Sequence, residues 1–544
     1  MKERKICHPS HHRKKGCRFA CMVVIEMSRS VSNPLVLTFD VGTQSARVVL
    51  VDAQGNILDK VKKVYQEPYY SKYPNWAEQS PQTYWEIMCS ACRELKQRQA
   101  ARWDSIIAVT CTCIRGSAVC FDENGEPVRD AILWLDKRRA TGMPPLSLKT
   151  RTMFRAARLT DTIEVLRSGF YCNWLALNEP ETWAKTKTYG LLSTYFNVKF
   201  TGILKDSNAN MCGILPYDTK NHSWYPKSDF HRELYLIDDS RLFELVKPGT
   251  VLGGITEQAA RETGIPQGLP FVVTGSDKLC ETLGLSCTTA DTAAISLGTL
   301  SSIQVPSRRF FTMQMVLPPF PSLTGDFLNE LQTYRGFWLV SWFKEQFGQK
   351  EVEAAGKLGV SAEQLLDEQL GTVPPGCDGL IMQPTLTPEA VTPHARGVFL
   401  GLTEVHTRMH FYRAIVEGIS FILYDGLKAL EKAGKTEVMR AFIAGGGSNS
   451  PYICQIVADV SGLPIYRIQT GEASGLGSSI LAFVSLGVFP DIDSALAAMV
   501  HEKDHFDPDP QVHALYKRMY YQIYHKMFPR LVKLYRTIYQ IFIN

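Results

Sequence analysis

Two short segments far apart in the chain carry the same set of residues that could bind phosphate. The pattern Gly-Thr-x-Ser occurs at residues 42–45 and again at residues 298–301, each time between two apolar, strand-forming runs. Glycine lets the backbone approach a ligand, and the N–H groups and hydroxyls of such a turn can donate hydrogen bonds to phosphate oxygens. A plain hairpin turn has the same local pattern. Because a repeated supersecondary unit indicates a duplicated architecture, the recurrence favours two halves that hold one polyphosphate between them.

Two carboxylates stand at strand ends where such a site would need them. Asp40 ends the strand before the first turn, where a carboxylate can hold Mg²⁺, usually through water; the alternative is a carboxylate that only caps the turn. Asp277 follows the apolar strand that starts at Phe271 and precedes a predicted helix. Open α/β sheets bind ligands at that end of their strands, although a helix N-cap explains the same residue equally well.

Three further segments bring polar side chains or glycines to predicted strand ends. Arg115 lies in the strand region 106–121. Residues 132–140 combine Trp134 with one carboxylate and three cations; a solvated helix start explains the charges, and the aromatic ring before them favours a polar ligand pocket. Residues 438–450 predict a strand, a glycine-rich turn and a helix start, which leaves backbone room for a flat or phosphorylated ligand.

The elements expected to position these residues follow from hydrophobic periodicity. The segment 36–65 predicts an antiparallel meander of strands, and helices are predicted over 81–98, 407–433 and 473–486. The tail from Pro510 carries large apolar side chains at helical spacing, which favours a docking face over a cofactor site. That stripe consists of Tyr516, Tyr520, Tyr524 and Met527.

Composition and charge exclude several classes of protein. With 544 residues and 45% hydrophobic content, the chain can bury large cores and should form about two to four domains. The formal charge of +5 comes from residues 1–34, which hold eight Lys or Arg against two Glu and leave the remaining chain at −1. We therefore expect neither nucleic acid nor a membrane as a partner, and no apolar run reaches the roughly 18 residues of a membrane helix.

The cysteines indicate a reducing compartment. The 14 Cys follow no framework spacing, and many lie in apolar runs, so they are typical of buried free thiols. At Cys111 and Cys113 we expect packing rather than chemistry. Residues 1–33 are interpreted as a dispensable extension, with Met27 as a candidate start; a zinc site built from their scattered Cys and His is the alternative, although the spacing fits no standard finger.

Taken together, these motifs resemble those of the FGGY carbohydrate kinase family, over residues 35–505. Asp40–Arg47 resembles the family's first phosphate motif, the Gly-Thr at residues 298–299 its second, and Gly445–Ser450 its adenosine motif. No GxxxxGK[ST] segment is present, so the hairpin turns rather than a P-loop must hold the phosphates.

The most specific part of the resemblance is a pair of segments in the second half. GlyValPheLeuGlyLeu at 397–402 is followed, after seven residues, by HisPheTyrArgAlaIleValGlu at 410–417, and together they match the family's C-terminal signature position by position. The resemblance implies an α/β, actin-like ATPase fold: two ribonuclease-H-like domains with the ligands in the cleft between them. The implied division is an extension at 1–33, an N-terminal domain at 34–288, a C-terminal domain at 289–505 and a helical tail at 506–544.

The resemblance also implies roles for individual residues. Asp277 matches the general base, and Asp40 matches the carboxylate associated with Mg²⁺. Arg115 and Trp134 fall at the substrate-binding Arg and Trp of glycerol kinase, with the Trp stacking on the carbon chain, and Lys278 stands where that enzyme has a substrate-binding Gln. The ATP-binding residues implied by the three motifs are Gly42, Thr43, Gln44, Ser45, Arg47, Gly298, Thr299, Gly446, Gly447 and Asn449.

Several positions depart from the family pattern. Gly116 stands where a carboxylate follows the substrate-binding Arg, and Tyr171, three residues before Trp174, stands where the N-terminal signature expects a Lys. With Lys278 and the block 330–338, these departures indicate a poorly characterised branch whose substrate does not transfer from its relatives.

The function implied by the resemblance is an ATP- and Mg²⁺-dependent kinase that phosphorylates a hydroxyl of a small sugar, polyol or sugar acid. Family habit adds a cytoplasmic homodimer, with the apolar tail as a candidate contact. The alternative is an actin-like sensor or scaffold that binds nucleotide and sugar without turnover. Retention of Asp40, both Gly-Thr turns and Asp277 favours the enzyme.

Overall fold

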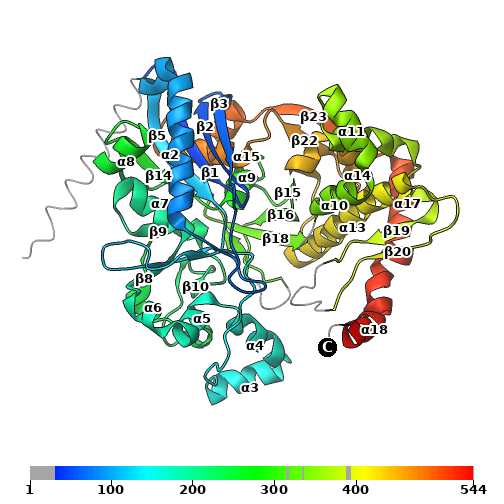
Figure 1. Cartoon of the computed structure of the whole chain (residues 1–544), viewed down its shortest axis with the longest axis horizontal. Coiled ribbons are helices and arrows are strands. Elements are labelled where there is room, and N and C mark those ends of the chain that lie inside the picture. The colour runs from blue at the N-terminus through cyan, green and yellow to red at the C-terminus, as the bar shows by residue number, and fades with distance from the viewer. Residues whose placement is uncertain (1–30, 314–317, 334–335, 387–393, 543–544) are drawn as a thin grey trace, which may run out of the picture.

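The chain forms two lobes that lie side by side, each built around a mixed β-sheet (Figure 1). The structure is a computed structural model that describes residues 31–313, 318–333, 336–386 and 394–542. The predicted zinc alternative and most of the predicted extension fall on residues 1–30, outside the described residues.

The sheet of the first lobe has the strand order β13-β14-β5-β1-β2-β3. Strands β1, β2 and β3 form the predicted antiparallel meander, while β5 pairs in parallel with both β1 and β14. Strand β1 is buried along its whole length, because it lies inside the sheet, whereas the edge strand β3 is partly exposed. The bounds are β1 Leu35–Val41, β2 Ser45–Asp52, β3 Ile57–Val64, β5 Ile106–Cys113, β13 Val251–Gly254 and β14 Pro270–Val273.

The sheet of the second lobe repeats this arrangement. Its order is β17-β18-β16-β15-β21-β22-β23, in which β15, β16 and β18 form the antiparallel meander and β21 pairs in parallel with both β15 and β22. The duplicated architecture expected from the two Gly-Thr-x-Ser turns is thereby confirmed. The bounds are β15 Thr292–Leu297, β16 Ser301–Ser307, β17 Phe320–Pro321, β18 Phe327–Thr333, β21 Arg440–Ala444, β22 Ile465–Ile468 and β23 Glu502–Phe506.

Helices and a small second sheet complete the first lobe. The predicted helix over 81–98 is α2, and it packs with α7 and α8 on one face of the main sheet. The small sheet β4-β7-β6-β8 and the helices α3 to α6 extend the lobe downwards in Figure 1. The bounds are α2 Pro81–Arg98, α3 Leu148–Ala156, α4 Thr160–Ser168, α5 Tyr171–Asn178, α6 Pro180–Lys185, α7 Leu192–Thr201, α8 Glu257–Thr263, β4 Glu78–Gln79, β6 Ala118–Phe121, β7 Ala131–Ile132 and β8 Thr188–Leu191.

The second lobe is organised around the long helix α13, which was predicted at 407–433. Helices α10 to α12 and α14 pack beside it, and it covers strands β16 and β18. The bounds are α10 Trp338–Phe347, α11 Gln349–Leu358, α12 Ala362–Glu368, α13 Arg408–Gly434, α14 Pro451–Ser461, α15 Ala473–Ser485, α16 Ile492–Met499, α17 Pro510–Met519 and α18 His525–Phe542.

The apolar stripe of the tail docks on the same chain. Tyr516, Tyr520, Tyr524 and Met527 are all buried in the core of the second lobe, against α13. The Tyr516 hydroxyl donates to Glu417 Oε1 at 2.6 Å. The predicted docking face is thus real, but its partner is internal, so these four side chains are not available as a contact for a second copy.

The two lobes are joined by an exchange of helices. Helix α9 (Asp277–Gly284) follows the last strand of the first sheet and reaches β15 and β16 of the second, while α15 comes from the second lobe and packs on β1 and β5 of the first. The two helices lie against each other, and a single core of buried side chains runs through both lobes at this point.

Glycines let α9 and α15 approach within backbone contact. A Cβ added at Gly477 would lie 1.9 Å from the carbonyl oxygen of Cys280, and one at Gly284 would lie 2.0 Å from that of Ala473. Hydroxyl pairs complete the joint, because Ser479 Oγ lies 2.8 Å from Thr38 Oγ1 and Ser478 Oγ lies 3.0 Å from Thr110 Oγ1. The buried polar groups of α15 are therefore satisfied by the first sheet.

This contact predicts a large cost for a single methyl group. We expect Gly477→Ala to lower the free energy of unfolding by about 1–3 kcal/mol, because overpacking forces the two helix backbones apart. Chemical denaturation measured by circular dichroism tests this.

Gly356→Ala in α11 is the matched control, since nothing lies within 4 Å of the added methyl. Alanine has the higher helix propensity, so this variant should be as stable as the original protein or more stable by up to about 1 kcal/mol. Equal stability of the Gly477→Ala variant would contradict the proposed backbone contact.

Candidate functional site

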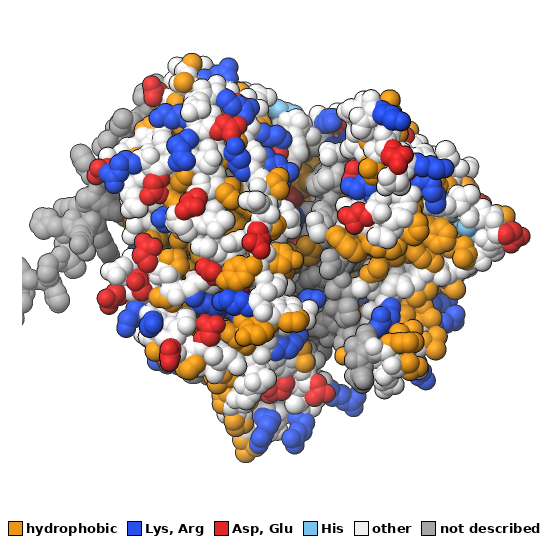
Figure 2. Space-filling model, in the orientation of Figure 1, with side chains coloured by type: hydrophobic (Ala, Val, Ile, Leu, Met, Phe, Trp, Pro, Cys, Tyr) orange, Lys and Arg blue, Asp and Glu red, His pale blue; other side chains and the backbone are white. Residues whose placement is uncertain are grey.

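The two Gly-Thr-x-Ser turns connect equivalent strands of the two sheets. Gly42 N–H donates to Ser45 O at 3.0 Å, and Gly298 N–H donates to Leu300 O at 3.1 Å. A Cβ at either glycine would lie 3.2 Å from that same carbonyl oxygen, so a tight turn rather than a positive φ favours glycine here. The surface is hollowed between the two lobes (Figure 2).

Asp277 connects the two turns. It is the first residue of α9, after the N-cap Ser276, and its Oδ1 accepts the backbone N–H of Lys278 at 2.8 Å. Lys278 Nζ in turn donates to Ser296 Oγ at 2.5 Å, two residues before Gly298. On the other side, the charge of Asp277 acts on Asp40, two residues before Gly42. Asp277 is therefore close enough to Asp40 for their charges to interact, and Lys278 joins it to β15, the strand that precedes the second turn.

Burial controls the ionisation of both carboxylates. It raises the pKa of Asp277, against the opposing charges of Lys278 and Arg115. It also raises the pKa of Asp40 to about 6, although Arg47 opposes the shift and Asp277 adds to it. Arg47 Nη1 donates to Asp40 Oδ2 at 3.0 Å.

Glu472, which the sequence analysis did not single out, also belongs to this site. It is the N-cap residue of α15 and comes from the second lobe. Its carboxylate lies 3.5 Å from Arg47 Nε and 2.7 Å from Lys60 Nζ. Arg47, expected among the nucleotide-binding residues, is therefore already held by carboxylates of both lobes.

Each of the three expected substrate-binding side chains has defined contacts in the structure. Arg115 forms an ion pair with Glu330 of β18, and its guanidinium lies 4.0 Å from the centre of the Phe320 ring. Trp134 Nε1 donates to Thr43 Oγ1 at 3.0 Å, which ties the aromatic residue to the first phosphate turn. Lys278 Nζ also lies 3.0 Å from Glu281 Oε1.

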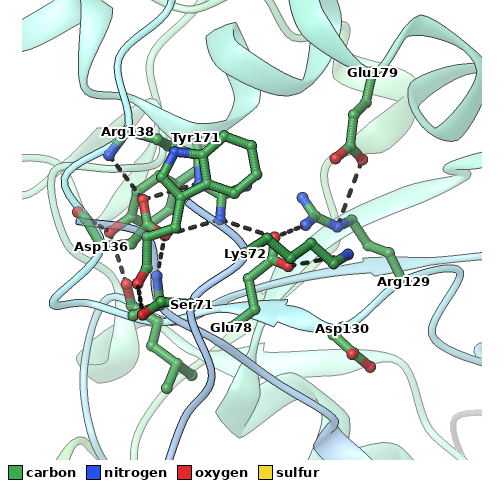
Figure 3. Close-up of polar contacts among 12 residues, drawn as sticks. Ser71, Lys72, Glu78, Arg129, Asp130, Asp136, Arg138, Tyr171 and Glu179 are labelled. Carbon is green, nitrogen blue, oxygen red and sulfur yellow. Dashed lines mark hydrogen bonds and ion pairs between the residues drawn. The ribbon is translucent and has the colours of Figure 1, made fainter. Parts of the chain in front are cut away.

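Asp136 and Arg138, two of the four charged residues that follow Trp134, belong to a buried polar network (Figure 3), whereas Lys137 and Arg139 are exposed. The Arg138 side chain is 1% exposed and donates to Glu78 and Asp136, both at 2.8 Å. Its guanidinium lies 3.9 Å from the Trp76 ring centre and 4.5 Å from that of Trp174. A helix expected to begin at these charges is therefore absent from residues 136–140, which the structure describes as an irregular segment.

Tyr171 holds the backbone on both sides of Trp134. Its hydroxyl donates to Leu133 O at 2.9 Å, with Asp136 O at 3.3 Å. The position where the family signature expects a Lys is thus occupied by a residue that anchors the Trp134 segment, and Arg138 supplies the nearby cation.

In the glycine-rich turn of the second lobe, Gly445 and Gly447 are tightly packed, whereas Gly446 and Asn449 are exposed to solvent. A Cβ at Gly447 would lie 2.8 Å from the Phe337 ring, and one at Gly445, where φ is +90°, would lie 2.7 Å from the Leu297 backbone. Nothing lies within 4 Å of a Cβ at Gly446, and Asn449 is exposed. Gly446 and Asn449 are therefore the positions of this turn that a nucleotide could reach.

Comparison with protein families identifies the chain. Residues 35–284 match the N-terminal domain of the FGGY family of carbohydrate kinases, and residues 293–486 match its C-terminal domain. The chain belongs to the FGGY family of carbohydrate kinases. It is therefore an ATP-dependent phosphotransferase that acts on a hydroxyl group of a small sugar, polyol or sugar acid.

Individual relatives cover nearly the whole FGGY kinase chain. It is 30% identical over 480 residues to the uncharacterized sugar kinase YgcE of Escherichia coli (strain K12). The matched region covers 88% of this chain and 90% of the relative. The chain is 26% identical over 509 residues to a xylulose kinase of Staphylococcus epidermidis, covering 92% and 97% of the two chains.

Solved structures show the same actin-like fold. A xylulose kinase from Lactobacillus acidophilus superimposes with a TM-score of 0.79 at 20% identity, over 93% of this chain and all of that one. A glycerol kinase from Plasmodium falciparum gives a TM-score of 0.72 at 18% identity, over 91% and 98% of the two chains. The expected fold of two similar α/β domains is confirmed.

The raised pKa of Asp40 predicts a pH-dependent effect of its removal. A carboxyl with pKa 3.8 when unfolded and about 6 when folded disfavours the folded state above pH 6, by roughly 3 kcal/mol at most. We expect Asp40→Asn to raise the thermal midpoint of the ligand-free protein at pH 7.5.

The same reasoning gives the sign at lower pH. The advantage of the variant should shrink as the pH falls from 6 towards 4, because the wild-type carboxyl then takes up its proton in the folded state. Differential scanning calorimetry at several pH values measures both midpoints. A difference that stays constant from pH 4.5 to 7.5 would contradict the raised pKa.

Proposed function

We propose that this FGGY kinase uses Asp277 as the general base that accepts the proton of the substrate hydroxyl. The observation that supports this proposal is that the buried Asp277 interacts electrostatically with Asp40, before the first turn, and is linked through Lys278 to Ser296 of β15, before the second. Burial also raises its pKa towards neutrality, where a general base is most effective.

Phosphoryl transfer then needs little covalent chemistry from the protein. The hydroxyl oxygen attacks the γ-phosphorus, its proton passes to the Asp277 carboxylate, and the bond from the γ-phosphorus to the β–γ bridging oxygen breaks to release ADP. The turns at residues 42–45 and 298–301 would orient the phosphates by their N–H and hydroxyl groups, and Gly446 and Asn449 would contact the adenosine. Positioning and the exclusion of water by the two lobes supply the remaining rate enhancement.

Asp40 is the residue proposed to hold Mg²⁺. Its burial, its place at the end of β1 and its charge contact with Asp277 fit a carboxylate that binds a hydrated metal ion beside phosphates. Among the described residues no group of three or more His, Cys, Asp or Glu could hold a metal by itself, which fits an ion that ATP brings with it. When bound, Mg²⁺ would neutralise charge on the transferring phosphates.

The acceptor is proposed to bind between Trp134, Arg115 and Lys278. Trp134 is held by Thr43 and by the Tyr171 anchor, so its ring is fixed for stacking on a carbon chain. Relatives and structural neighbours are named xylulose, gluconate and glycerol kinases, so D-xylulose, D-gluconate and glycerol belong in the first acceptor panel.

We also propose a domain division, an assembly and a location for the protein. The domains are proposed as residues 34–288 and 289–505, followed by the tail from 506, and the joint through α9 and α15 lies between them.

A homodimer is proposed through α18, whose outward side chains Leu534, Ile541 and Phe542 are 58%, 66% and 78% exposed. A cytoplasmic location is supported by the free cysteines of the described residues. No described helix meets the length and apolarity needed to cross a bilayer.

Removing the base should separate binding from turnover. We expect Asp277→Asn to keep its affinity for ATP and to lower kcat by about 10²–10⁴-fold, because only proton transfer is lost. Coupled ADP release with the acceptor panel measures turnover, and calorimetry measures ATP binding. Unchanged kcat in this variant would refute the assignment.

The same measurements distinguish the kinase from a sensor that binds without turnover. Acceptor-stimulated ADP release by the wild-type protein supports the kinase. Binding of ATP and sugar without ADP release would support the sensor, for which Asp277→Asn would have no effect on any rate.

A further inference from the structure

A hairpin of the second lobe reaches across the cleft to the expected acceptor site. Strands β17 and β18 and the turn between them contact the first lobe at three separate places. The Phe320 ring lies against the Arg115 guanidinium, and the Phe327 ring stacks on His222 with 5.8 Å between ring centres. Between them, the Leu323 side chain packs so closely on Gly275 that a Cβ added there would lie 2.7 Å from it. The hairpin therefore forms one wall of the acceptor site.

Glu330 is the charged residue on that wall. Its side chain is 1% exposed and forms an ion pair with Arg115, whose own side chain is 11% exposed. The second oxygen of Glu330 accepts from Gln304 Nε2 at 3.0 Å, which orients the carboxylate. Burial alone would raise the pKa of Glu330, but Arg115 and the amide of Gln304 hold it below its usual value, so the group stays ionised at neutral pH.

Both members of the ion pair retain hydrogen-bonding capacity. Arg115 Nη1 is buried without a hydrogen-bond partner, and the charge of Arg115 acts on Asp277. An ionised carboxylate has about four acceptor positions. Arg115, Gln304 and Gln332 occupy three of those of Glu330, so one position is left for a ligand. A buried guanidinium nitrogen without a partner is costly, so a ligand that accepts from it would be favoured.

We propose that Glu330 is a specificity-determining residue for the acceptor: together with Arg115 it binds two neighbouring hydroxyl groups of the substrate. One hydroxyl accepts from Arg115 Nη1, and the adjacent one donates to the Glu330 carboxylate. The acceptor class is therefore a compound with a vicinal diol. This inference rests on the kinase reaction proposed for the same site.

The proposal also connects substrate choice to lobe closure. Arg115 follows β5 of the first lobe and Glu330 lies on β18 of the second, so the diol site is complete only when the lobes are together. A substrate that binds both groups stabilises the closed arrangement in which Asp277 lies between the phosphate turns.

The test is Glu330→Gln, which keeps the size of the side chain and removes its charge. With D-xylulose, glycerol and D-gluconate as probes, we expect KM for each phosphorylated acceptor to rise about 10- to 100-fold, the loss typical of a hydrogen bond to a charged group. KM for ATP should rise much less than KM for the acceptor, because the proposed contacts of Glu330 are with the acceptor hydroxyls and not with the nucleotide.

Glu351→Gln is the matched control. Glu351 is also a Glu of the second lobe paired with an Arg, Arg408, and its side chain is 7% exposed. It lies on α11, where its carboxylate accepts from Arg408 and Gln369, neither of which is proposed to bind a ligand. All kinetic constants of this variant should stay within twofold of wild type. Thermal midpoints of both variants show whether a change in stability contributes.

The outcomes distinguish this inference from the kinase function itself. If wild type phosphorylates an acceptor and Glu330→Gln leaves its KM unchanged, or raises KM for ATP and acceptor equally, Glu330 is only a structural ion pair and the proposal is wrong. Calorimetry of the same sugars with Asp277→Asn and with the Asp277→Asn, Glu330→Gln double variant measures binding without turnover. Binding that is lost only in the double variant supports the proposal; wild type that neither binds nor phosphorylates any of the three overturns both this proposal and the proposed function.

Discussion

The close contact between α9 and α15 is the constraint on which the rest of the structure depends. Helix α15 of the second lobe packs on the sheet of the first, and α9 of the first lobe hydrogen-bonds to β15 and β16 of the second. The two helices can approach because Gly284 and Gly477 leave no side chain between their backbones. Asp277 is the first residue of α9 and Glu472 is the N-cap residue of α15, so both carboxylates stand at the N-termini of the two helices. The packing that joins the lobes therefore also sets the distance between the charged groups of the cleft.

The electrostatics of the cleft follow from that packing. Its cations are paired with carboxylates, often from the opposite lobe: Arg47 with Glu472, and Arg115 with Glu330. Buried charges need such partners, because desolvation would otherwise exceed the gain from any single interaction. Asp40 differs from the other paired charges, because the charge of Arg47 only partly offsets the effect of its burial. The pKa of Asp40 therefore rises to about 6. A cation bound beside Asp40 would stabilise the ionised carboxylate and lower its pKa again, as expected of a carboxylate that is associated with a metal ion.

Sequence reasoning recovered the elements whose signal is local. The meander at 36–65, the helices at 81–98 and 407–433, and the repeat of Gly-Thr-x-Ser all lie where periodicity and turn chemistry predict them. It misjudged groups whose partners are distant in the chain. For the charges after Trp134 the sequence favoured a ligand pocket over a solvated helix start, and it did not show that Glu78 and two tryptophans enclose Arg138. The tail stripe suggested a face for another chain, but α13 of the same chain covers it.

The amino-acid sequence by itself determined the duplicated α/β architecture, the phosphate turns and the carboxylates at the strand ends, because these depend on hydrophobic period and on residues adjacent in the chain. Tertiary structure alone decided the partners of Arg47 and Arg115. Glu330 lies 215 positions from Arg115, and no periodicity or spacing relates two side chains that meet only when separate lobes pack. Ion pairs across the cleft form only when the two lobes fold against each other. In the sequence, the paired residues are therefore visible only as isolated charged residues.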